Sequence, residues 1–146
     1  LFGLFIDRKG KSATAMIFGA ATLLLVHLSF ALTPFRPHAF LILLGVAFSL
    51  VPAAMWPGMV KLVRDKEMGT AYGLMYSVQN LGLWGVPILA GMVLDRTNPG
   101  SPEVLNYTPT LLMFAGLSLL GLLFAIFLKW EDSRKGFGVE KPLNKR

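Results

Sequence analysis

Five side chains of this sequence could bind a polar small molecule, although they lie in stretches without any charge. They are Ser49, Trp56, Tyr76, Gln79 and Asn80. Hydroxyl and amide groups exchange hydrogen bonds with polar ligands, and an indole ring attracts cations. The sequence shows no pairing of a nucleophile with a base and no cluster of metal ligands. We therefore predict a noncovalent binding site, and no enzyme, cofactor or metal centre.

The elements that carry these residues are long uncharged blocks. Only 15% of the 146 residues are charged, whereas about 25% is usual in a soluble domain. Formal charge is absent from residues 12–33, 39–60, 68–94 and 104–128. Each block exceeds the ~20 residues with which a helix crosses a bilayer, and a lone strand would leave its backbone unpaired in lipid. The sequence predicts an all-α membrane protein with transmembrane helices at about 12–33, 39–63, 68–94 and 108–130.

The third block, which includes GTAYGLMYSVQNLG (69–82), has one polar face. At about 100° per residue, an arc of about 100° holds Tyr72, Tyr76, Gln79 and Asn80. Such a face should turn from lipid towards other helices or a watery cavity, since an unpaired amide in hydrocarbon is costly. Gly69 and Gly73 border this face, and we expect them to let a neighbouring backbone approach closely.

The second block has a comparable face at steps of three or four residues. Its members are Gly45, Ser49, Pro52, Trp56 and Met59. Pro52 and Pro57 each remove a helix hydrogen bond, so we expect a kink near Trp56. The first and fourth blocks are apolar nearly all round, which suits helices that face lipid.

The same side chains also have structural interpretations. Trp56 could anchor a helix at the membrane surface, and Gln79 and Asn80 could join neighbouring helices. We expect His27, in the first block, to be a hydrogen-bonded structural residue rather than a proton relay. No Asp, Glu, Lys or Arg lies within the four blocks, so no buried relay for proton coupling is visible in this sequence.

Basic residues are distributed unevenly over the two sides of such a protein. If the four spans alternate in direction, all but Arg36 and Arg96 of the 14 Lys and Arg residues lie on one side. The positive-inside rule predicts that this side is cytoplasmic. It includes the polar tail at 131–146, which we expect to be little ordered beyond its first turn. The net charge of +6 therefore reflects topology, and no aromatic-basic pattern indicates a nucleic-acid partner.

The first segment, LFGLFIDRKGK (1–11), reads as the end of a further apolar span and a cytoplasmic loop. We expect the chain to be the C-terminal part of a longer protein. Within it, Gly3, Asp7, Arg8, Gly10 and Lys11 resemble the loop signature of the major facilitator superfamily, Gly-x-x-x-Asp-Arg-x-Gly-Arg/Lys. The resemblance implies that residues 1–11 end span eight of a twelve-span fold and that residues 12–130 are the last four spans.

That resemblance implies alternating access, in which two halves rock about a site near the midplane. The span at 39–63 would line the cavity and the span at 68–94 would border it. The five side chains introduced first would then contact substrate. The signature loop would be a conformational switch, in which Asp7 meets a helix end of the opposite half in one state.

The run GTAYGLMYSVQNLGL, with WP before it and AGMVLD after it, resembles the lysosomal dipeptide uniporter branch of this superfamily. The resemblance implies dipeptide export from lysosome to cytosol through a multi-pass lysosomal membrane protein with a cytoplasmic C-terminal tail. A carrier for a sugar or a carboxylate, and a membrane scaffold without transport, stay open as alternatives. The implied partners are a small-molecule substrate, the lipid bilayer, the N-terminal half of the same transporter, and a second copy or a lumenal accessory membrane protein.

Overall fold

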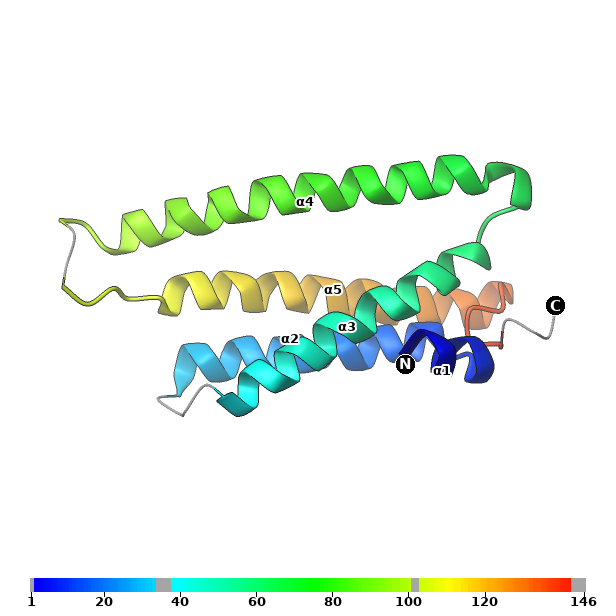
Figure 1. The fold of residues 1–146 in the computed structure, drawn as a ribbon, viewed down its shortest axis with the longest axis horizontal. Coiled ribbons are helices and arrows are strands. Elements are labelled where there is room, and N and C mark those ends of the chain that lie inside the picture. Colours follow the sequence, from blue (N-terminus) through cyan, green and yellow to red (C-terminus); the bar gives the residue numbers. More distant parts are fainter. Residues whose placement is uncertain (1, 34–37, 101–102, 143–146) are drawn as a thin grey trace.

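The computed structural model describes residues 2–33, 38–100 and 103–142, which are helical with short connections (Figure 1). The long helices are α2 (Ser12–Leu32), α3 (His38–Val60), α4 (Met68–Thr97) and α5 (Thr108–Lys135). A short helix α1 (Phe2–Lys9) precedes them, and a 3-10 turn η1 (Asp65–Glu67) lies between α3 and α4. The described residues contain no strand, and all four long helices are long and apolar enough to cross a membrane. The predicted all-α class is confirmed.

Two helices extend beyond the spans expected from the sequence, because charge alone does not end a helix. The α4 helix continues past Asp95 to Thr97, and α5 continues past Lys129 to Lys135. The end of α5 is set by Gly136, whose φ of 68° suits a left-handed C-cap and whose N–H donates to the Asp132 carbonyl at 2.8 Å. The α3 helix is continuous across Pro52 and Pro57, and the kink near Trp56 stays a prediction.

The core lies where α2 packs along α3 and α5 and where α1 packs on α3. Ile6, Leu50 and Ala54 form a buried cluster there. The α2 and α3 helices approach closely at Gly19 of α2, where an added Cβ would lie 2.6 Å from Cγ2 of Val51. Glycine is therefore required at Gly19 for α2 and α3 to approach this closely.

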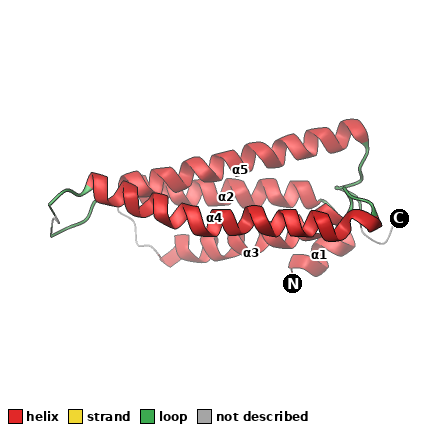
Figure 2. Cartoon of the chain, turned by 90° about the horizontal axis from the view of Figure 1, so that it is seen from above, coloured by secondary structure: helices red, strands yellow, loops and turns green. Residues whose placement is uncertain are grey.

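The α4 helix runs along the outside of this group (Figures 1 and 2). It contacts α5 and η1, and none of its residues is buried. A Cβ at Gly69 or Gly73 would meet no atom within 4 Å. The close approach expected at these glycines is therefore absent within the described residues, although Trp56 of α3 contacts Tyr72 and Tyr76 of the same helix.

The segment after α5 is better ordered than its polar composition suggested. Residues 136–142 fold back over the start of α2 and the end of α3, at the end of the bundle where α1 leads into α2 (Figure 1). Val139 is fully buried there, and the positive φ angles of Gly136 and Gly138 allow the reversal. Lys11, Lys61 and Lys129 also lie at this end, which we call the basic end.

Candidate functional site

Trp56, Tyr72 and Tyr76 form an aromatic cluster between α3 and α4. The Trp56 ring stacks on Tyr72, with centroids 5.5 Å apart and planes at 26°. The same ring lies 4.9 Å from the Tyr76 ring at 41°. Trp56 and Tyr72 are half-buried and Tyr76 is 53% exposed. The cluster therefore presents aromatic surface and a phenol group that a ligand could reach.

The connection between the two helices explains why these rings meet. Residues 61–67 form a short link, so α3 and α4 run antiparallel beside each other. Trp56 lies about one turn before the end of α3 at Val60, and Tyr72 lies about one turn after the start of α4 at Met68. This depth also suits a tryptophan anchor at the membrane surface, but Trp56 contacts two tyrosines of α4 as well.

Ser49 lies on α3 about two turns from Trp56 and on the same side of the helix. Its side chain is exposed, and Oγ donates to the Gly45 carbonyl at 2.8 Å. The oxygen lone pairs stay able to accept a hydrogen bond. Ser49 is thus near the aromatic cluster along the helix, but it does not belong to it.

Gln79 and Asn80 continue the polar face of α4 beyond Tyr76. Both are exposed, and Asn80 Nδ2 donates to the Tyr76 carbonyl at 2.8 Å, within its own helix. A purely structural role would require a bond from Asn80 to another helix. Among the described residues, the structure shows no such bond. The amide oxygen of Asn80 and the amide of Gln79 extend the surface that begins at the aromatic cluster.

The signature loop occupies a separate place, at the basic end. Gly3, Asp7 and Arg8 lie in α1, whereas Gly10 and Lys11 form the turn into α2. Gly10 has a φ of 75° and Lys11 a φ of 63°, so both adopt the left-handed conformation. Arg8 is exposed. The loop therefore does not contribute to the aromatic site.

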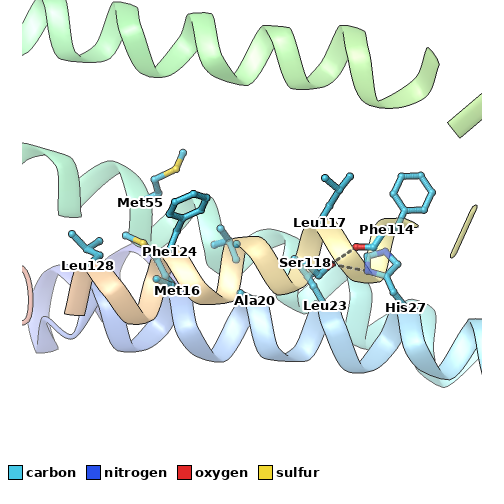
Figure 3. Close-up of a pocket in the computed structure, with 13 residues that line it drawn as sticks. Met16, Ala20, Leu23, His27, Met55, Phe114, Leu117, Ser118, Phe124 and Leu128 are labelled. Atoms are coloured by element: carbon cyan, nitrogen blue, oxygen red, sulfur yellow. Dashed lines mark hydrogen bonds between the residues drawn. The ribbon is translucent and has the colours of Figure 1, made fainter. Parts of the chain in front are cut away.

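A pocket of about 480 Å³ lies among α2, α3 and α5 (Figure 3). Its wall is mostly apolar and includes Met55 and Phe124. At one end, His27 Nδ1 lies 3.0 Å from Ser118 Oγ, and the His27 ring stacks on Phe114 with centroids 5.7 Å apart. His27 is hydrogen-bonded inside the helix group, as expected. This pocket lacks the polar groups needed to orient a polar solute.

The chemistry available at the aromatic site is noncovalent. The faces of α3 and α4 that carry it offer rings, a hydroxyl and two amides, and no charge occurs between Met68 and Leu94. The described residues contain no group of three His, Asp or Glu side chains that could hold a metal ion. Such a site can stack on a planar group, attract an ammonium ion and exchange hydrogen bonds.

The structure brings only some of the predicted residues together. Trp56 and Tyr76 are in contact, Asn80 bonds to the backbone of Tyr76, and Gln79 and Ser49 lie further along the two helices. Sequence reasoning put Tyr72 on the polar face of the third block but not in the site. Its spacing of four residues from Tyr76 was the signal that could have found it.

Comparison with known proteins adds an independent finding. The profile described as Major Facilitator Superfamily matches residues 1–141. The chain is 41% identical over 146 residues to "Lysosomal dipeptide transporter MFSD1" of Bos taurus, which covers all of this chain and 30% of that protein. It is 43% identical to the Mus musculus protein and 41% identical to the Homo sapiens protein of that name, each over 95 residues, 65% of this chain and 20% of the relative. The chain thus spans less than a third of the length of these curated relatives, and no solved structure matches it.

Proposed function

We propose that this chain, which belongs to the Major Facilitator Superfamily, is the C-terminal part of a transporter that moves small organic solutes by alternating access. Members of this family act on small molecules from within a lipid bilayer. In the proposal, residues 1–11 end span eight, residues 12–130 provide four spans, and residues 131–146 form the tail. Two helical halves would rock about a shared site, as in other carriers built from repeats.

The aromatic cluster is the observation that carries a binding role for this part of the chain. In the proposal, Trp56 and Tyr76 hold a substrate group against their rings, and Ser49, Gln79 and Asn80 provide hydrogen bonds. A dipeptide suits this set of groups, since its ammonium can lie against an aromatic face and its peptide group can pair with an amide. The names of the relatives, lysosomal dipeptide transporters, support the same substrate.

Uniport from the lysosomal lumen to the cytosol is the mode of transport that we propose. The four uncharged blocks contain no Asp, Glu, Lys or Arg that could relay a proton. Transport down a dipeptide gradient needs no such group. The concentration of lysines at the basic end supports a cytoplasmic position for that end, and the tail would lie on the same side.

The exposed α4 helix supports the proposal that other parts of the protein complete this fold. A membrane helix with amides on its surface needs polar partners or water. The N-terminal half of the same transporter would face the polar side of α4 across the proposed cavity. A second copy, or a lumenal accessory membrane protein, would be a further partner. The signature loop would act as the conformational switch between the two halves.

Two alternatives make different predictions. A carrier for a sugar or a carboxylate would use the same rings and amides, and it would be inhibited by that solute rather than by dipeptides. A membrane scaffold without transport would keep the polar faces of α3 and α4 dry against other helices.

The test uses the full-length protein that contains this chain, reconstituted in liposomes with a labelled dipeptide. We expect uptake down the dipeptide gradient, and we expect Trp56→Ala to lower it by about tenfold, because the stacking surface is lost. Trp130→Ala is the matched control, since Trp130 contacts Phe127 and Arg134 at the end of α5 and no residue of the aromatic cluster. No dipeptide uptake by the parent protein would disprove the proposal, and an equal loss in both variants would remove Trp56 from the site.

A further inference from the structure

The start of α2 is capped by a residue from the other end of the chain. Its N-cap residue, Lys11, has a left-handed backbone and makes no side-chain capping bond. Instead, Thr14 N donates to Glu140 Oε1 at 2.8 Å, and Thr14 Oγ1 donates to Glu140 Oε2 at 2.7 Å. A carboxylate at a helix N-terminus satisfies free N–H groups and complements the helix dipole.

The backbone of Glu140 also fixes the shape of the signature loop. The Glu140 carbonyl accepts the N–H of Lys11 at 2.9 Å. The same oxygen lies 2.5 Å from the position that a Cβ on Gly10 would occupy. The Glu140 carboxylate therefore holds the first turn of α2, and its carbonyl holds the signature loop at Lys11. Gly10 makes this close approach possible.

Two further elements hold Glu140 in place. The Lys61 ammonium, at the end of α3, donates to the carbonyls of Val139 at 3.0 Å and Lys141 at 2.6 Å. The Asp132 carboxylate of α5 accepts the N–H groups of Val139 at 3.0 Å and Glu140 at 3.2 Å. The segment at 136–142 is thus fixed to α3 and α5 independently of its contact with α2.

We infer that Glu140 is a positioning residue that holds the signature loop ready to contact the other half of the transporter, and so favours the state closed at the basic end. The inference rests on the proposed function. The loop lies at the ends of the helices, so it can contact the opposite half only when the basic ends come together. A loop already held in its bound shape loses less conformational freedom on contact, which favours the closed state.

The experiment measures which state the full-length protein occupies. Two single-cysteine probes, Gly45→Cys on α3 and Gly73→Cys on α4, are placed where an added Cβ meets no atom within 4 Å. Gly73 is nearer the basic end and Gly45 nearer the opposite end. A membrane-impermeant thiol reagent is applied to each side, in a background where the other cysteines of the full-length protein are replaced.

We expect Glu140→Gln to increase labelling of the Gly73 probe from the basic side and decrease labelling of the Gly45 probe from the other side. The ratio should change by about tenfold, as for the loss of a charge-assisted hydrogen bond. Glu131→Gln is the matched control, because this substitution removes the same charge at a residue that pairs with Lys135 on α5 at 3.2 Å. If Glu140→Gln does not reach the membrane, Thr14→Val should shift the ratio in the same direction, since it removes the hydroxyl that donates to Glu140 and accepts from Lys129.

Two results overturn different statements. If the parent protein transports dipeptides and the labelling ratio is the same in Glu140→Gln and Glu131→Gln, the positioning role is wrong and the proposed function stands. If the ratio changes only in Glu140→Gln while the parent transports no dipeptide, Glu140 positions the loop and the proposed substrate is wrong.

Discussion

At the scale of single residues, the candidate site differs from a packed membrane interface in where its polar groups find partners. Ser49 and Asn80 donate to carbonyls of their own helices and leave acceptor oxygens exposed. His27 and Ser118, by contrast, join two helices directly. In the first pattern, acceptor oxygens stay available to a ligand, whereas in the second the polar atoms are already bonded between helices.

Asn80→Leu tests this difference. The change keeps a similar volume and leaves α4 intact, but it removes the amide oxygen offered to substrate. We expect dipeptide uptake by the full-length protein to fall by about tenfold, as for the loss of one ligand hydrogen bond, with normal membrane insertion. Val78→Leu, on the opposite side of α4 and 63% exposed, is the control that should keep parental uptake. Full activity of the Asn80 variant would mean that substrate does not contact this amide.

At the scale of elements, α2, α3 and α5 form a supporting group with close helix packing, and α4 carries exposed polar groups beside it. The packing of α2 on α3 depends on Gly19, because Cγ2 of Val51 occupies the space of a side chain. This contact fixes the position of α3, and α3 in turn carries Ser49 and Trp56. The packing at Gly19 therefore helps to determine where Ser49 and Trp56 lie.

Gly19→Leu should accordingly destabilise the helix group. Overpacking a close contact costs about 1–3 kcal/mol, so we expect the full-length protein in detergent to unfold at a temperature lower by several degrees. Gly116→Leu is the control, since a Cβ at Gly116 of α5 meets no atom within 4 Å. Equal melting temperatures for the two variants would show that α2 and α3 are further apart in the complete protein.

At the scale of the whole molecule, the exposed surface of this chain has two kinds of membrane face. The α5 helix exposes leucines such as Leu123, and α4 exposes Leu74 on one side and the amides of Gln79 and Asn80 on the other. Apolar faces suit lipid, and amide-bearing faces require partners or water. This asymmetry is what a cavity at the centre of a larger helix assembly would produce.

Cysteine labelling of the full-length protein separates a transporter from a scaffold. We expect Ser49→Cys to react with a water-soluble thiol reagent, because the proposed cavity admits water, and Leu123→Cys to resist it, because lipid excludes the charged reagent. Addition of dipeptide should slow the reaction at Ser49→Cys. A dry, unreactive Ser49→Cys, with reactive Leu123→Cys, would contradict the assigned orientation of α3 and α5.

The sequence by itself determined the class of the protein and the polar faces of its helices. Each uncharged block is long enough to cross a bilayer as a helix, which satisfies its backbone hydrogen bonds within the segment. Helical periodicity then places Tyr72, Tyr76 and Asn80 on one side. The signature residues from Gly3 to Lys11 indicated the superfamily, which the match over residues 1–141 confirmed. These properties are local, because they depend on residues close together in the chain.

Only the tertiary structure decided which distant residues meet. It brought Trp56 against Tyr72 and Tyr76, and it showed that a Cβ at Gly69 or Gly73 would meet no described atom within 4 Å. It also placed Glu140 at the start of α2, 126 residues from Thr14 in sequence. No periodicity relates such pairs, since their contact follows from how helices pack and how the chain reverses after α5, and those depend on side-chain shapes across the whole bundle.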